Sequence, residues 1–93
     1  MINSFGDSET ELIFKGLRSK KLPPAIHNFA RRKLRMIAAA KEVKDLRIPP
    51  GNKLEQLAGN LAGLWSIRIN DQWRIVFSFE NGGADNVRIT DYH

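Results

Sequence analysis

The chain ends in an acid–base cluster, Asp91-Tyr92-His93. The unperturbed pKa of imidazole is about 6.5, so His93 can accept and donate protons near neutral pH, and a neighbouring carboxylate such as Asp91 can orient the ring. A histidine at a chain end is more often solvated than catalytic. The cluster therefore predicts catalysis only if the fold holds it beside a group that binds a substrate.

A row of arginines in the C-terminal half is the candidate for that group. Three segments alternate apolar and polar residues in the manner of β-strands, at about 64–69, 73–79 and 86–92. Their apolar residues share one face, which should cover a core. The opposite face should be open and carry Ser66, Arg68, Arg74, Val76, Ser78, Arg88 and Thr90.

The short turn at 70–72 predicts which residues face each other across the first pair of strands. If Ile69 and Trp73 share a face, Arg68 lies directly opposite Arg74. Like charges in that position cost about 0.2 to 1 kcal/mol, whereas an anion between the two guanidinium groups would be bound by both. Antiparallel pairing also brings the end of the third strand, with its acid–base cluster, next to Trp73 and Arg74.

Such a face suits the cleavage of an RNA phosphodiester by its own 2′-hydroxyl. This reaction needs proton transfer from the 2′-oxygen, neutralisation of charge at the phosphate, and protonation of the leaving 5′-oxygen. Arg74 would hold the phosphate, and His93 or Asp91 would move protons. The alternative, which stays open on this pattern, is an ordinary solvated sheet face.

Composition narrows the class of protein. The 93 residues suffice for one domain, 1–93, with a single core. The chain has no cysteine and two histidines far apart, so we expect no disulfide, no metal site and no cofactor. Its start lacks the features of a signal peptide, and no apolar stretch approaches the roughly 18 residues of a membrane span. We expect a cytoplasmic protein without membrane contact.

The positive charge is concentrated in the first half of the chain. Residues 1–47 hold 11 Lys and Arg against 5 Asp and Glu, a balance of +6, while residues 48–93 hold 4 against 5, a balance of −1. Between Arg18 and Arg35 there are seven basic residues and no acid. The run suits a phosphate-bearing or acidic partner, although a solvated helix face has the same composition.

Two helices should position the sheet. A short strand at 2–5 precedes a helix over 9–17, for which Asp7 or Ser8 is the N-cap. Pro23-Pro24 begins an amphipathic helix over 24–43.

On that second helix, His27 falls on the side of the basic residues, so we expect it at the surface with no catalytic role. Pro49-Pro50 ends the helical region, and 51–63 should form a long irregular loop.

Several motifs together resemble the HigB-type toxins of the RelE/ParE toxin–antitoxin superfamily, and the resemblance spans essentially the whole chain. They are Met1-Ile2-x-Ser4-Phe5, Pro50-Gly51-Asn52-x-Leu54-Glu55-x-Leu57-x-Gly59, Trp65-Ser66-Ile67-Arg68, Asn70-Asp71-Gln72-Trp73-Arg74 and the terminal Asp91-Tyr92-His93.

The resemblance implies an α+β fold, with two N-terminal helices packed on a small antiparallel sheet in the compact, microbial-RNase-like RelE arrangement. It also implies a metal-independent endoribonuclease that cuts mRNA in the ribosomal A site. A HigA-type helix-turn-helix antitoxin from the same operon would neutralise it, and operator DNA would be reached only through that antitoxin.

Residue roles follow from the same motifs. Arg74 would bind the phosphate, and Asp91, Tyr92 and His93 would form the catalytic tail. Some relatives carry His and Lys in the loop where this chain has Glu55 and Ala58, so Glu55 becomes a candidate proton acceptor. The residues expected to contact RNA are Arg68, Arg88 and Lys53 near the sheet, and Arg31, Arg32, Arg35, Lys20 and Lys21 toward ribosomal RNA.

Two other functions remain open. ParE-type relatives are associated with DNA gyrase rather than RNA, but a gyrase inhibitor has no need of Asp-Tyr-His beside an arginine. A catalytically inactive module that binds RNA or a protein partner on the same scaffold is the other alternative.

Overall fold

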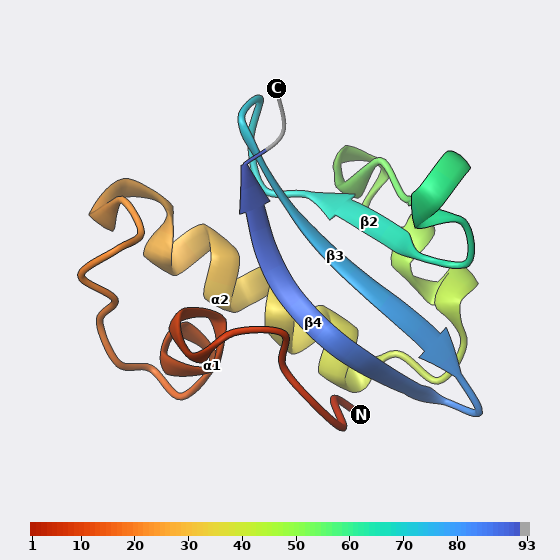
Figure 1. Ribbon diagram of the computed structural model, residues 1–93, viewed down its shortest axis with the longest axis horizontal. Helices are drawn as coiled ribbons and strands as arrows, with labels where there is room; N and C mark the ends of the chain where they lie inside the picture. The colour runs from red at the N-terminus through yellow and green to blue at the C-terminus, as the bar shows by residue number, and fades with distance from the viewer. Residues whose placement is uncertain (92–93) are drawn as a thin grey trace.

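Four antiparallel strands form one sheet in the order β1-β2-β3-β4, and two helices cover one of its faces (Figure 1). This computed structural model describes residues 1–91. Within that range no helix is long and apolar enough to cross a membrane. The elements are α1 (Ser8–Phe14), α2 (Pro24–Ala39), the 3₁₀ turns η1 (Val43–Arg47), η2 (Pro50–Asn52) and η3 (Gly59–Leu61), and the strands β1 (Glu55–Gln56), β2 (Trp65–Arg68), β3 (Trp73–Glu80) and β4 (Gly83–Asp91). The predicted α+β class is confirmed.

The N-terminal segment lies beside β4 without becoming a full strand. Ile2 and Phe5 form isolated parallel bridges with Ala84 and Val87, so the strand predicted at 2–5 is reduced to two contacts. Parallel bridges here leave the segment at the open edge of the sheet, next to β4 (Figure 1).

Helix α1 begins at Ser8, one residue before the predicted start, and ends three residues before the predicted end at residue 17. The Asp7 carboxylate accepts the Thr10 amide at 2.6 Å and caps the first turn. The helix ends at Phe14 rather than at residue 17, because Gly16 adopts a positive φ of 84°, which a right-handed helix excludes.

Helix α2 begins at Pro24 as predicted but stops at Ala39 instead of continuing to residue 43. The Asp45 carboxylate accepts the backbone amides of Lys41 and Glu42, each at 3.0 Å. Local side-chain acceptors of this kind offer backbone amides an alternative to helical hydrogen bonds. The chain therefore leaves the helix and enters the 3₁₀ turn η1.

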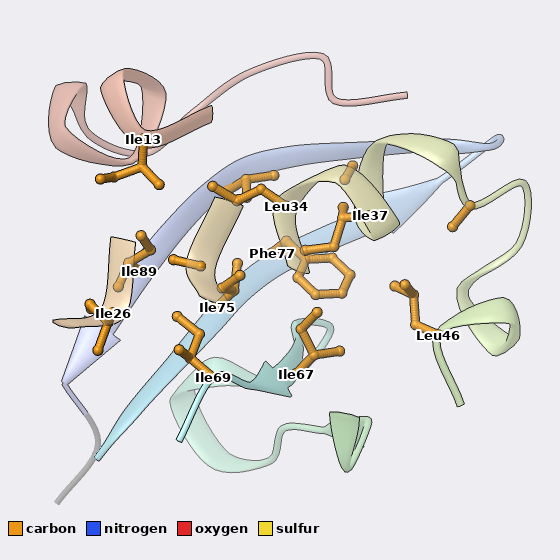
Figure 2. Close-up of a cluster of buried hydrophobic side chains, with 14 residues drawn as sticks. Ile13, Ile26, Leu34, Ile37, Leu46, Ile67, Ile69, Ile75, Phe77 and Ile89 are labelled. Atoms are coloured by element: carbon orange, nitrogen blue, oxygen red, sulfur yellow. The ribbon is translucent and has the colours of Figure 1, made fainter. Parts of the chain in front are cut away.

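The core lies between the helices and one face of the sheet. The side chains of Leu34 and Ile37 on α2 and of Ile75 and Phe77 on β3 are fully buried together, as Figure 2 shows. Burying a side chain of this size typically contributes about 1.5–3 kcal/mol. Ile67, Val87 and Ile89 complete the sheet side of the cluster, which confirms the predicted apolar face.

His27 contradicts its predicted place at the surface. Its side chain is only 6% exposed, and Nε2 lies 3.0 Å from the Leu22 carbonyl oxygen. A carbonyl oxygen can only accept, so Nε2 carries the proton and donates. Helical periodicity assigned His27 to the solvent side because it ignores the loop before α2, whose backbone reaches the ring.

A β-bulge in β4 corrects the simple alternation of the sequence. Val76 pairs with Arg88, but the next ladder pair is Ser78 with Asp85, so β4 contains one extra residue. Asn86 absorbs it with a positive φ of 54°. Ala84 and Val87 consequently both reach the core, although their spacing of three would place them on opposite faces of a regular strand.

The segment 51–63 is more ordered than the predicted irregular loop. It contains η2, η3 and the two-residue strand β1, in which Glu55 pairs with Ser66 and Gln56 with Trp65. The sheet therefore has four strands instead of the three that alternation predicted. This edge strand brings Glu55 into the sheet.

Candidate functional site

The face of the sheet away from the helices carries two cross-strand rows of polar side chains. In one row Arg68 lies directly opposite Arg74, as predicted, and Arg74 lies opposite Thr90. The neighbouring row runs Glu55, Ser66, Val76 and Arg88. Directly paired residues share a face, so Glu55 and Arg74 belong to the same surface.

The Arg74 side chain is buried within this face and held there by hydrogen bonds. Nε donates to Ser66 Oγ at 2.9 Å, and the Nη2 group donates to the Lys53 carbonyl at 2.6 Å and to the Ser66 carbonyl at 3.4 Å. The residue is 9% exposed, Ser66 is fully buried and Val76 is 2% exposed. The prediction of an open polar face is therefore wrong at its centre, because the chain around Lys53 folds back over the sheet.

The backbone at Lys53 aims its carbonyl at Arg74. Lys53 has a φ of 45°, which turns the chain sharply after η2. The preceding residue, Asn52, is fully buried and donates from Nδ2 to the Leu46 carbonyl at 3.2 Å. Lys33 donates to Asn52 Oδ1 at 2.5 Å. Both ends of the buried Asn52 side-chain amide are hydrogen-bonded, which fixes the conformation of the turn. The turn then holds the Lys53 carbonyl, one of the acceptors of Arg74, in place.

The acceptors of Arg74 named above are neutral. A hydroxyl and two carbonyls orient the guanidinium plane, but they do not cancel its charge as a carboxylate would. These acceptors fix the orientation of the guanidinium group before any anion arrives. Sequence reasoning placed Ser66 on this face but missed its role as a partner, which only strand register reveals.

Arg68 has an acidic partner close in the sequence. It forms an ion pair with Asp71 in the turn between β2 and β3 and keeps 32% of its side chain exposed. The repulsion expected between the facing arginines is therefore reduced by an acid three residues further along. Asp71 therefore already provides an anionic partner beside the facing arginines.

Asp91 lies at the end of β4, opposite Trp73 as predicted. Its Oδ2 accepts a hydrogen bond from Gln72 Nε2 at 3.1 Å. Trp73 packs against the core cluster, so alternation places Asp91 on the helix-facing side at the sheet's end, whereas Arg74 belongs to the opposite side. Tyr92 and His93, the other two residues of the predicted catalytic tail, lie outside the described residues.

Comparison with known proteins identifies the family. A family model described as "RelE-like toxin of type II toxin-antitoxin system HigB" matches residues 3–93. The chain belongs to this HigB-like toxin family. It is 48% identical over 69 residues to Toxin HigB-1 of Vibrio cholerae serotype O1, covering 74% of this chain and 73% of the relative. It is 33% identical to Endoribonuclease HigB of Proteus vulgaris over the full length of both.

Solved structures confirm the fold of the toxin. A YoeB–YefM complex from Staphylococcus aureus has a TM-score of 0.63 at 19% identity, covering 100% of this chain and 98% of the other. A YafQ mutant from E. coli gives 0.63 at 12% identity, with coverages of 98% and 93%. At these identities the likeness concerns the fold alone, and it agrees with the predicted RelE arrangement.

Four of the basic residues predicted to bind RNA are exposed on α2 and in the loop before it, on the helix side of the toxin. Arg32 and Arg35 are exposed on α2, whose opposite side packs into the core. Arg32 stacks over the exposed Phe29 ring at 5.4 Å. Lys20 and Lys21 are exposed in the loop before α2. The structure does not bring these cations together with the sheet arginines.

Arg31 and Arg88 are less available than sequence reasoning expected. Arg31 is half-buried and donates from Nε to the Ile13 carbonyl at 2.9 Å, tying α2 to α1. Arg88 is half-buried and donates to the Asn86 carbonyl at 2.8 Å, across the bulge of its own strand. Both side chains thus support the fold in addition to any contact with RNA.

Lys33 lies between the basic residues of the helices and the arginines of the sheet. Burial lowers its pKa below the ordinary value of 10.5, and the positive charges of Arg32 and Arg68 lower it further. Its ammonium therefore sits in a locally positive environment, relieved by the Asn52 carbonyl oxygen.

No metal centre can be assembled from the part of the toxin that the structure describes, since residues 1–91 contain no group of three His, Cys, Asp or Glu side chains suited to an ion.

Proposed function

We propose that the toxin is an endoribonuclease that cuts mRNA on the ribosome by attack of the RNA's own 2′-hydroxyl, without a metal ion. Family membership supports the toxin role, and the name of the Proteus vulgaris relative supports ribonuclease chemistry. The observation that carries the mechanism is the Arg74 guanidinium, aligned by Ser66 and the Lys53 carbonyl on a face shared with Glu55.

In this mechanism Arg74 holds the scissile phosphate and stabilises the negative charge that grows on its oxygens. The 2′-oxygen loses its proton to a base and bonds to phosphorus, while the bond from phosphorus to the 5′-oxygen breaks and that oxygen takes up a proton. The products are a 2′,3′-cyclic phosphate and a 5′-hydroxyl. Oriented cationic donors contribute most where charge develops in the transition state.

Glu55 is the proposed proton acceptor. It is exposed. Glu55 lies two strand spacings from Val76, and Arg74 is two residues further along β3. With strands about 4.8 Å apart and about 3.4 Å per residue, the Cα atoms of Glu55 and Arg74 are roughly 12 Å apart. A phosphodiester between the two side chains can be reached from both. Asp91, Tyr92 and His93 are assigned to the catalytic tail by their motif, with His93 as the donor to the leaving oxygen.

RNA contacts are proposed to divide between the two sides of the molecule. Arg68, Arg88 and Lys53 would contact the scissile strand near Arg74, and the helical cations would contact ribosomal RNA. The helical cations are Arg31, Arg32, Arg35, Lys20 and Lys21. Phosphate contacts of this kind make affinity salt-dependent without sequence choice.

The partner proposed to neutralise the toxin is a HigA-type helix-turn-helix antitoxin from the same operon, with operator DNA contacted only through that antitoxin. The site of action is the cytoplasm, where translating ribosomes expose mRNA in the A site.

The test is to add purified toxin to a translating extract and map new mRNA 5′ ends. Ends within the occupied codon, with naked RNA cut poorly, are expected. Glu55→Gln should lower kcat about 10²-fold or more with little change in KM, because it removes a base and keeps the shape. Intact mRNA, or topoisomers accumulating instead, would overturn the proposal.

A further inference from the structure

The backbone of Lys53 is strained at the point where it contacts Arg74. Its φ of 45° and ψ of 56° lie in the left-handed region, which a residue with a β-carbon adopts only when its surroundings hold it there. The carbonyl of this residue accepts from the Nη2 group of Arg74 at 2.6 Å. The Lys53 side chain is exposed, so neighbouring residues must supply the constraint.

Asn52 is the neighbour that holds the turn. It is fully buried, and its backbone amide donates to the Pro49 carbonyl at 3.0 Å. Its Nδ2 group donates to the Leu46 and Ile48 carbonyls at 3.2 and 3.5 Å. The same group lies 3.8 Å from Met36 Sδ on α2, which is a weak acceptor. The donor end of Asn52 therefore binds its own segment more firmly than it binds the helix.

Lys33 makes the strong bond between this segment and α2. Its side chain is half-buried, and Nζ donates to Asn52 Oδ1 at 2.5 Å. A hydrogen bond from an ammonium group is roughly twice as strong as one between neutral groups. Because Asn52 has no exposed surface, removing the donor would leave its oxygen without a strong partner.

Its partner distinguishes Lys33 from its neighbours on α2. Arg32 and Arg35 are exposed, where a cation can contact a polyanion without first losing a bond to the protein. The Lys33 ammonium is bonded to a buried side chain, and burial lowers its pKa, as do the charges of Arg32 and Arg68. A lysine that served only as an RNA contact would need no partner inside the protein.

We propose that Lys33 is a positioning residue for the cleavage reaction and that it acts on Arg74 through Asn52 and the Lys53 carbonyl. The contacts run from α2 to the buried amide, and from the left-handed turn to the guanidinium group. Without the first contact the turn can move, and its carbonyl no longer holds Nη2 in one place. The inference rests on the proposed function, in which Arg74 holds the scissile phosphate.

The experiment measures kcat and KM of the full-length toxin for mRNA on programmed ribosomes. Lys33→Met keeps the length of the side chain and removes the donor. It should lower kcat about fivefold and leave KM within about twofold, because the transition state loses an oriented donor while RNA affinity is kept. Lys15→Met is the matched control, since it removes the same charge from an exposed side chain paired with Glu11 at 3.5 Å. It should leave kcat and KM within about twofold.

Coupling to Arg74 separates positioning from a general loss of order. In an Arg74→Lys background, Lys33→Met should change kcat by less than about twofold, because the group that it positions is already absent. Circular dichroism at the assay temperature gives the folded fraction, by which each rate is divided. Lys33→Gln, which is shorter and uncharged, is the second variant in case Lys33→Met folds poorly, and it should lower kcat in the same direction.

Three results would each overturn the inference. They are an unchanged kcat in the Lys33 variants, a raised KM in place of a lowered kcat, and an equal loss of kcat in the wild-type and Arg74→Lys backgrounds. A wild-type rate in Arg74→Ala would overturn the proposed function. Inactive Arg74→Ala together with a wild-type rate in Lys33→Met would overturn the positioning role alone.

Discussion

Both faces of the sheet are buried at their centres, but by different interactions. On the helix side Ile67, Ile75 and Phe77 are fully buried in an apolar cluster. On the other side Ser66 is fully buried and Arg74 is 9% exposed, held by a hydroxyl and backbone carbonyls. Apolar burial is non-directional and tolerates small shifts, whereas a buried cation needs each acceptor in place.

Because of this difference, we expect the two faces of the sheet to control different properties, stability on the helix side and activity on the Arg74 side. Substitutions on the helix side should act mainly on the free energy of unfolding. Substitutions on the Arg74 side should act mainly on how the guanidinium is aimed, with smaller effects on stability.

Phe77→Ala should lower the free energy of unfolding by about 3–5 kcal/mol, because it removes a fully buried ring from the centre of the core. Urea denaturation followed by tryptophan fluorescence measures the loss. Phe77→Leu is the milder control and should cost less. A loss below about 1 kcal/mol for the alanine variant would mean that the helix-side core is not the main source of stability.

Arg74→Ala should reduce the cleavage rate about 10²- to 10³-fold, the effect of removing one oriented donor from a transition state. It should also cost about 1–3 kcal/mol of stability, because the Lys53 carbonyl and Ser66 lose a buried partner. Arg74→Lys keeps the charge but cannot reach both acceptors, so most of the rate should remain lost. Full activity in the lysine variant would show that charge alone suffices.

Ser66→Ala tests how the Arg74 guanidinium group is oriented, because it leaves the charge of Arg74 in place. It deletes the acceptor of Arg74 Nε and should reduce kcat about tenfold while costing about 1 kcal/mol of stability. Ser78→Ala is the matched control on the same face, because its hydroxyl donates only to the Asp85 carbonyl at 3.4 Å. Equal losses of activity in the two variants would contradict a positioning role for Ser66.

Lys33 should have a smaller effect, which is a pH dependence of the unfolding free energy. Its pKa is lowered below 10.5 in the folded state, so between the lowered pKa and 10.5 the unfolded chain binds more protons. Stability contributed by this group therefore rises with pH across that alkaline window. Lys33→Met should lose this rise, measured as the difference in unfolding free energy between the two proteins at several alkaline pH values. Parallel curves would contradict the lowered pKa.

The local sequence pattern determines much of the structure without any tertiary contact. The period of two in β2 and β3, with the short turn at 70–72, placed Arg68 opposite Arg74. Sequence signals also limited the N-cap of α1 to Asp7 or Ser8, of which the structure has Asp7, and located the start of α2 at Pro24. These features depend on residues close in the chain, so periodicity and capping chemistry are enough to specify them.

Only the tertiary structure decided what surrounds the functional side chains. Burial of Arg74 depends on the Lys53 carbonyl, 21 residues away, and burial of His27 depends on the loop that contains Leu22. Strand β1 has two residues, too few for alternation to reveal, yet it brings Glu55 onto the Arg74 face. Contacts of this kind are made by backbone groups whose direction depends on how distant segments pack, and side-chain periodicity carries no record of that direction.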